Sequence, residues 1–194
     1  MRIGIRHPFA LSLCLLLAVF FDGTGIIRAC IIAILLHECG HALLLVLLLH
    51  QKPVFQVSFG GIALRWNTAS AGTIKQTVIL LAGPLANGAA TAISYAFCNH
   101  QLQLGLYLFG GVNLLLGIFN LLPLGFLDGG RLLELFLQQF LPCDKVWKGL
   151  RAVQIVVLSF LSLFLLLFSS NTAARIALLL FFGYYCGKSF FVKN

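Results

Sequence analysis

Long apolar stretches separated by short polar ones dominate the chain. They predict six membrane-spanning helices, over roughly 8–21, 27–49, 76–98, 104–124, 152–169 and 173–189. Because a helix needs about 20 mostly apolar residues to cross a bilayer, the first and last stretches lie near the lower limit. The first could also be a signal peptide, but bulky Phe20 and Phe21 close it where small residues would mark a cleavage site. We therefore predict an all-α polytopic membrane protein in which residues 1–194 form one domain.

Between the second and third apolar stretches the pattern changes to strict alternation. Phe55, Val57 and Phe59 fall on one face of a predicted strand, and Gly60-Gly61 provide a two-residue turn before a return strand over 62–66. An ordinary cytoplasmic loop is the alternative. The alternation favours a small membrane-associated β-hairpin whose exposed edge could pair with an extended peptide.

Composition and charge agree with a membrane protein. Hydrophobic residues make up 60% of the chain and charged residues 9%, whereas about a quarter of a soluble domain is charged. The net charge of +8 does not indicate nucleic-acid binding, because the basic residues are strung between apolar stretches. If the N-terminus is cytoplasmic, only Arg28 and Arg175 of the 13 Lys and Arg lie outside. Both termini of this multi-pass protein are therefore predicted to be cytoplasmic.

The sequence His37-Glu38-Cys39-Gly40-His41 lies within one of the apolar stretches. Residues four apart share a helix face, so His37 and His41 can hold one metal ion, and Glu38 beside it can accept a proton from water. Polar side chains at membrane depth are costly and usually have a function. Cys39 would point away from the histidine face, and the six scattered cysteines predict no disulfide framework.

A catalytic zinc site normally has three protein ligands, so one more must exist. Of the four acidic residues other than Glu38, Asp22 lies on the outer side, Asp144 lies among basic residues and Glu134 sits on a predicted surface helix over 130–141. This leaves Asp128, with a helix N-cap role as the alternative. Asn120 precedes it in Asn120-Leu121-Leu122-Pro123 and could act at the site. Asn87 and Asn113 are expected to form hydrogen bonds between helices.

These motifs resemble the paired signatures of the site-2 protease family of intramembrane zinc metalloproteases, peptidase family M50. The resemblance covers about residues 27–141 and includes Ala82-Gly83-Pro84-Leu85-Ala86-Asn87. It implies one Zn²⁺ per chain held by His37, His41 and Asp128, and Glu38 as the catalytic base. It also implies Asn120 near the substrate or oxyanion, and a substrate edge that includes Phe55, Val57, Phe59, Gly60 and Gly61.

The implied activity is cleavage of a transmembrane segment of a single-span, membrane-tethered protein near the cytoplasmic side of a bacterial cell membrane. In size the chain is similar to the small sporulation branch that processes a sigma factor. It ends at Asn194, so we expect no nucleotide-sensing C-terminal domain. The sequence leaves open whether the protein has a regulatory membrane partner and whether it forms a homo-oligomer. The main alternative is a catalytically silent zinc protein or chaperone that binds transmembrane segments; a metal transporter would need ionisable residues on both sides.

Overall fold

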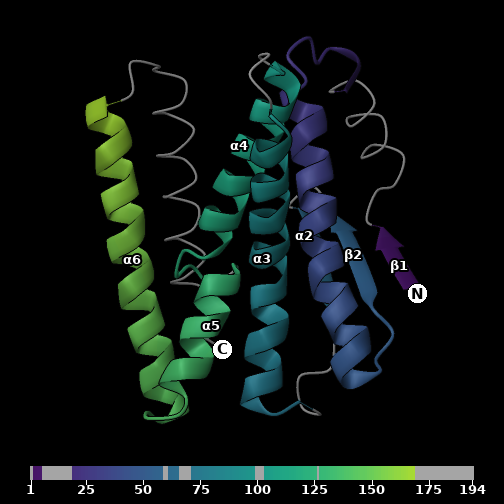
Figure 1. The fold of residues 1–194 in the computed structure, drawn as a ribbon. Helices are drawn as coiled ribbons and strands as arrows, with labels where there is room; N and C mark the ends of the chain where they lie inside the picture. Colours follow the sequence, from purple (N-terminus) through teal and green to yellow (C-terminus); the bar gives the residue numbers. More distant parts are fainter. Residues whose placement is uncertain are drawn as a thin grey trace. The chain divides into compact units, whose positions relative to one another are not determined.

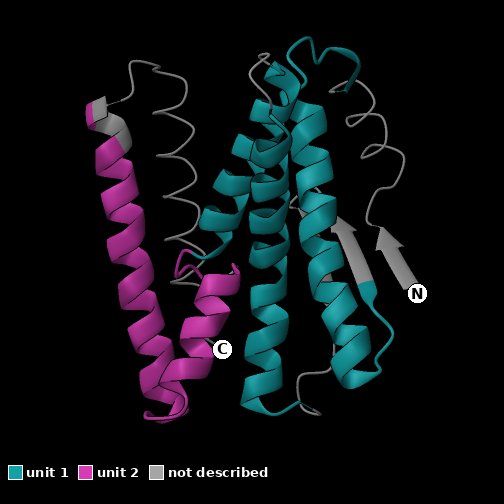
Figure 2. Cartoon of the chain, viewed as in Figure 1, with its two compact units in different colours: residues 1–121 teal, residues 122–194 magenta. Residues whose placement is uncertain are grey.

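The computed structural model describes residues 2–5, 19–58, 61–65, 71–98, 103–125 and 127–168 (Figure 1). Residues 1–121 and 122–194 form two compact units, which are described separately below (Figure 2). The sixth predicted span lies outside the described residues, and so does the first apart from residues 19–21. The number of six spans and the single domain therefore stay predictions.

The described residues of the first unit include three apolar helices: α2 (Ile26–Leu49), α3 (Thr73–Phe97) and α4 (Leu104–Asn120). They pack against one another side by side (Figure 1). α2 and α3 are long and apolar enough to cross a membrane, whereas α4 has only 17 residues. Large apolar side chains on their outer faces are exposed, among them Leu43, Leu85 and Leu115. Such surfaces are suited to lipid, and they confirm the prediction of a membrane protein.

Small residues let the three helices approach closely. A Cβ added to Gly40 on α2 would lie 2.6 Å from the carbonyl oxygen of Ala82 on α3. A Cβ at Gly117 on α4 would lie 3.3 Å from Cβ of Asn87 and 3.4 Å from the carbonyl oxygen of Pro84 on α3. Helix pairs in membranes commonly use small residues in this way, because close backbones gain van der Waals contact. Pro84 lies inside α3 without ending it.

A polar cluster precedes α2. The Asp22 carboxylate accepts hydrogen bonds from the Arg28 backbone N–H (3.0 Å) and the Thr24 hydroxyl (3.0 Å), and the Arg28 guanidinium lies 3.5 Å away. The Arg28 N–H is the largest cause of a lowered pKa of the Asp22 carboxyl. The Asp22 carboxylate therefore has its polar partners at the beginning of α2, where the helix N-terminus also favours a negative charge.

A three-stranded sheet with the order β1-β2-β3 belongs to the same unit. β2 (Val54–Ser58) pairs antiparallel with β3 (Gly61–Arg65) and parallel with β1 (Arg2–Ile5). Ser58 pairs with Gly61, so the two-residue connection is 59–60 rather than the predicted 60–61, and it lies outside the described residues. β3 contacts α2. The association of this hairpin with the membrane stays a prediction.

The second unit contains α5 (Asp128–Leu137) and α6 (Cys143–Phe168), which pack against each other. A buried cluster of Leu124, Leu127 and Leu158 ties the chain before α5 to α6. The predicted span 104–124 is too long, because the helix ends at Asn120. The helix that contains the predicted span 152–169 begins earlier: the Pro142 carbonyl accepts from the N–H groups of Lys145 and Val146, and α6 is helical from residue 143.

Candidate metal centre

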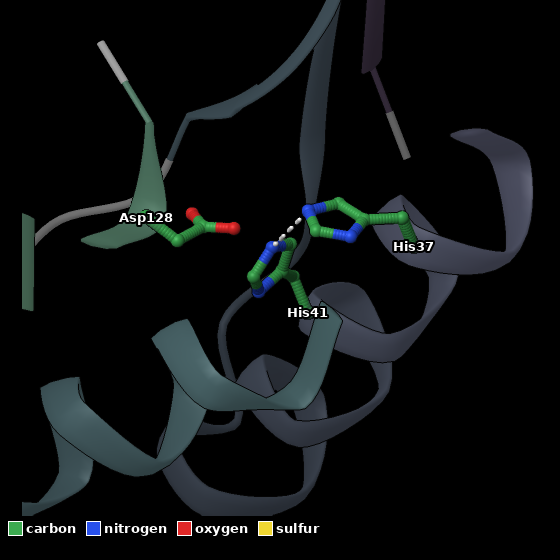
Figure 3. A group of neighbouring side chains, drawn as sticks. All are labelled: His37, His41 and Asp128. Carbon is green, nitrogen blue, oxygen red and sulfur yellow. Dashed lines mark hydrogen bonds between the residues drawn. The ribbon is translucent and has the colours of Figure 1, made fainter. Parts of the chain in front are cut away.

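The two histidines of α2 face each other inside the first unit. His37 and His41 are only 4% and 6% exposed, and their rings meet edge to face with centroids 4.7 Å apart (Figure 3). Their Nε2 atoms are 3.1 Å apart. The spacing of four residues places both side chains on one face of the helix, as the sequence predicts.

Each imidazole is held by a second contact through its other nitrogen. Nδ1 of His37 lies 2.7 Å from Oδ1 of Asn87, and Nδ1 of His41 lies 2.7 Å from the backbone carbonyl oxygen of Ile79. Oxygen atoms of both kinds only accept hydrogen bonds, so each Nδ1 donates its hydrogen. In the neutral rings, both Nε2 atoms therefore carry a lone pair.

Two lone pairs that face each other at 3.1 Å repel unless a positive charge lies beside them. At the usual Zn–N distance of about 2.0–2.1 Å, two nitrogen ligands on a tetrahedral ion are about 3.3 Å apart. Imidazoles whose Nδ1–H is bonded to an oxygen are the usual arrangement of metal-bound histidine. The pair therefore fits one zinc ion.

Gly83 on α3 leaves the space beside the histidines open. A Cβ at this position would overlap Nε2 of His41 and lie 2.8 Å from Cε1 of His37. Any side chain there would occupy the volume in front of the two donor atoms. The glycine is thus required by the site and not by backbone conformation.

The residues between the histidines differ in exposure. Glu38 follows His37 on α2 and is half-buried, whereas Cys39 is exposed and carries a free thiol. The exposure of Cys39 agrees with the expectation that it points away from the histidine face. Glu38 is placed one residue from a candidate ligand, as an acid–base group of this motif must be.

Asp128 belongs to the second unit, where it is 9% exposed and is the first residue of α5. The N-cap position is Leu127, so the alternative of Asp128 as the N-cap residue is wrong. A helix N-terminus favours a negatively charged carboxylate. A Cβ at Gly130 would overlap the carbonyl oxygen of Leu124, so this glycine permits the tight turn that leads into α5. Figure 3 draws Asp128 together with the two histidines.

Asn120 is the last residue of α4 and is half-buried. Its side-chain amide donates to the Leu116 carbonyl oxygen at 3.0 Å. Asn87 has a larger part in the site than the sequence indicates, since it contacts a candidate ligand directly. The Ile79 carbonyl could not be found from sequence at all, because a backbone group leaves no trace in residue identity.

Comparison with known proteins points to one family. The profile of Peptidase family M50 matches residues 97–167, a stretch that includes Asn120 and Asp128. Stage IV sporulation protein FB of Bacillus subtilis (strain 168) is 31% identical over 147 residues, which are 73% of this chain and 50% of that protein. The chain thus spans half the length of this relative. The site-2 protease from Methanocaldococcus jannaschii has a similar fold, with a TM-score of 0.61, 23% identity, and coverage of 94% of this chain and 87% of that one.

A pair of oriented imidazoles buried on an apolar helix, among helices that can cross a bilayer, defines a membrane protein with a candidate metal centre. The sequence similarity to known proteins also identifies the family of this membrane protein. The chain belongs to peptidase family M50.

Proposed function

We propose that this chain is a zinc-dependent intramembrane endopeptidase. Its substrate would be a membrane-tethered protein, cleaved within its transmembrane segment near the cytoplasmic side. The observation that carries the proposal is the pair of Nε2 lone pairs of His37 and His41, 3.1 Å apart and fixed by Nδ1 hydrogen bonds. Membership of a protease family supplies the reaction class.

Asp128 is our candidate for the third zinc ligand. Apart from Glu38, the other acidic residues of the chain have different surroundings: Asp22 is bound at the beginning of α2, Glu134 accepts from Gln138, and Asp144 is exposed. Two histidines and one carboxylate leave a fourth position open for water. A zinc ion bound there would supply the Lewis acidity that polarises a water molecule and the scissile carbonyl.

Glu38 would act as general base and then as general acid. Its carboxylate would accept a proton from the attacking water and pass that proton to the nitrogen of the leaving amine. Asn120 could donate an amide N–H to the oxygen that gains negative charge, as donors in oxyanion holes do. The excess of basic residues on one side of the predicted spans would place this chemistry toward the cytoplasm of a bacterial cell.

Zinc content tests the proposal without knowledge of the substrate. We expect one zinc per chain in detergent-purified wild type, measured by elemental analysis, and its loss in His41→Ala and in Asp128→Ala. Asp144→Ala is a matched control, because Asp144 also lies in the first turn of a helix but is exposed. Zinc retained in Asp128→Ala would identify a wrong third ligand. Folded wild type without zinc would contradict the metal centre as a whole.

The sheet offers a second testable element of the proposal. A helical peptide bond must be unwound before hydrolysis, and pairing with a strand edge would hold the substrate extended. Phe55 and Val57 lie on β2, which is paired on both sides, whereas β3 is an outer strand among the strands that the structure describes and contacts α2. We therefore propose the outer edge of β3, beginning at Gly61, as the part of the predicted edge that receives substrate. Phe59 and Gly60 lie outside the described residues.

Register identifies which backbone groups of β3 would bind. A two-residue connection is closed by a hydrogen-bonded pair, here Ser58 and Gly61, and such pairs alternate along an antiparallel ladder. The N–H groups of Ile62 and Leu64 thus point to the outer edge. We expect Ile62→Pro, which lacks this N–H, to slow cleavage about tenfold or more, whereas Ile62→Ala stays near wild type. Equal rates for both variants in a reconstituted cleavage assay would exclude pairing at this edge.

A further inference from the structure

A directional chain of hydrogen bonds runs through three helices of the first unit to the candidate ligand His37. Asn113 on α4 donates from Nδ2 to the Phe109 carbonyl oxygen at 2.9 Å. Its Oδ1 accepts from Nδ2 of Asn87 on α3 at 2.9 Å. Oδ1 of Asn87 lies 2.7 Å from Nδ1 of His37 on α2. Asn87 and Asn113 are both fully buried, with no exposed surface.

The partners fix which way each amide points. The amino group of Asn87 faces two acceptors, Oδ1 of Asn113 and the Ala33 carbonyl oxygen at 3.1 Å. Rotation of this amide by 180° would set its oxygen against both of them. Asn113 could accept the reversed amide only by turning its own oxygen toward the Phe109 carbonyl. A buried network of this kind is stable in one orientation, because the reverse leaves oxygen against oxygen.

The direction of the chain determines the tautomer of His37. Because Asn87 presents an oxygen, Nδ1 of His37 must carry the hydrogen and Nε2 must carry the lone pair. If the Asn87 amide were reversed, its N–H would favour the opposite tautomer, and the hydrogen on Nε2 would exclude a metal ion. Asn113 is thus connected to the donor atom of His37 without touching it.

We propose that Asn113 is a positioning residue for the metal centre, which acts through Asn87 to keep Nε2 of His37 available as a ligand. This inference rests on the proposed zinc site. The simpler role for Asn113 is a hydrogen bond that holds α3 and α4 together. The two roles differ in what they predict: adhesion between helices changes stability alone, whereas positioning changes the His37 tautomer and the zinc affinity.

Thr91 provides a matched control for the adhesive role. It lies on α3, and its hydroxyl donates to the Gly110 carbonyl oxygen of α4 at 3.1 Å. It also contacts the backbone carbonyl of Asn87, at 3.0 Å, but not the side-chain amide of that residue. Thr91→Val therefore removes a buried hydrogen bond between the same two helices and leaves the amide chain in place.

The experiment compares full-length wild type, Asn113→Leu, Asn113→Asp and Thr91→Val in detergent. We would measure the zinc Kd by competition with a chelator, and the histidine tautomers of the metal-free protein by ¹⁵N NMR after ¹⁵N-histidine labelling. Asn113→Leu should raise the Kd about tenfold, within the range for partners of metal ligands, and should mix the tautomers of His37. In Asn113→Asp one carboxyl oxygen can accept from Asn87, and the other, protonated in this buried site, can donate to the Phe109 carbonyl, so this variant should restore a single tautomer and most of the affinity.

His41 is an internal reference in the same spectra, because its Nδ1 bonds to the Ile79 carbonyl and not to the amide chain. An unchanged His41 signal shows that the variant is folded; if Asn113→Leu fails to fold, Asn113→Ala replaces it. A wild-type Kd and a single His37 tautomer in the Leu or Ala variant would overturn the inference, and so would an equal loss of affinity in Thr91→Val. Wild type that binds no zinc would instead contradict the proposed function.

Discussion

Replacing Glu38 with glutamine is expected to remove cleavage while zinc stays bound. The substitution keeps the size of the side chain and its hydrogen-bonding capacity but takes away the group that accepts a proton. General acid–base catalysis contributes about 10²–10⁴-fold to a rate, so a loss of that size is expected in a reconstituted assay with a membrane-tethered substrate. Zinc per chain should equal that of the wild type, because Glu38 is not among the proposed ligands.

Glu134→Gln is the matched control for this variant. Glu134 is half-buried like Glu38 and undergoes the same chemical change, but it lies on α5 and accepts from Gln138. We expect its cleavage rate to stay near wild type. Cleavage retained in Glu38→Gln would overturn the assigned mechanism. A wild type that binds zinc and membrane segments but cleaves none of them would favour the catalytically silent binding protein.

The second large effect is expected from one methyl group, in Gly83→Ala. The new Cβ would overlap Nε2 of His41 and lie 2.8 Å from Cε1 of His37, so the rings must turn or α3 must move away. Turning either ring breaks a 2.7 Å hydrogen bond from Nδ1. Overpacking of this kind usually costs about 1–3 kcal/mol. We expect the zinc Kd to rise about 10- to 100-fold, as it does when partners of metal ligands are lost.

Gly88→Ala makes the same substitution on the same helix in open space. Nothing lies within 4 Å of a Cβ at Gly88, so its zinc affinity should not change. Chelator competition on both variants measures the difference. If Gly83→Ala bound zinc like the wild type, the volume beside the histidines would not be needed by the metal, and the fit described above would be wrong.

Periodicity and hydropathy predict the element that carries the ligands well. The span expected over 27–49 is α2, Ile26–Leu49, and the predicted pairing of His37 with His41 needs only the geometry of one helix. The expectation that Asn87 and Asn113 form hydrogen bonds between helices is confirmed. What sequence could not predict is the partner of each bond, because it depends on how three separate helices pack.

Two helix boundaries differ from the boundaries predicted by hydropathy, and each difference has a physical cause. Leu121, Leu122 and Leu124 continue the apolar pattern of α4, but hydropathy does not detect that Pro123 lacks an N–H, and the helix ends at Asn120. Lys145, Lys148 and Arg151 precede the apolar stretch predicted over 152–169, so hydropathy does not include them in that span. A helix can extend beyond a membrane with charged side chains, and these residues belong to α6.

The hairpin shows a different limit of prediction from sequence. With Phe59 followed by Gly60 and Gly61, alternation alone does not determine which two residues form the connection. The pairing of Ser58 with Gly61 moves the turn by one position, and this shift exchanges the inward and outward backbone groups of the return strand. The sequence does not predict the parallel neighbour β1, because four residues near the N-terminus give too short a pattern.

The closeness of the helices at Gly40 restricts how a substrate can reach the histidines. A transmembrane helix with its side chains is about 10–12 Å across, whereas even one Cβ at Gly40 would lie 2.6 Å from the Ala82 carbonyl oxygen. The seam between α2 and α3 is therefore closed to a passing helix, and Gly117 closes the seam between α3 and α4 in the same way. Lateral movement of substrate out of the bilayer must avoid both seams. The close packing that orients the ligands therefore also leaves no room for a substrate helix at these two positions.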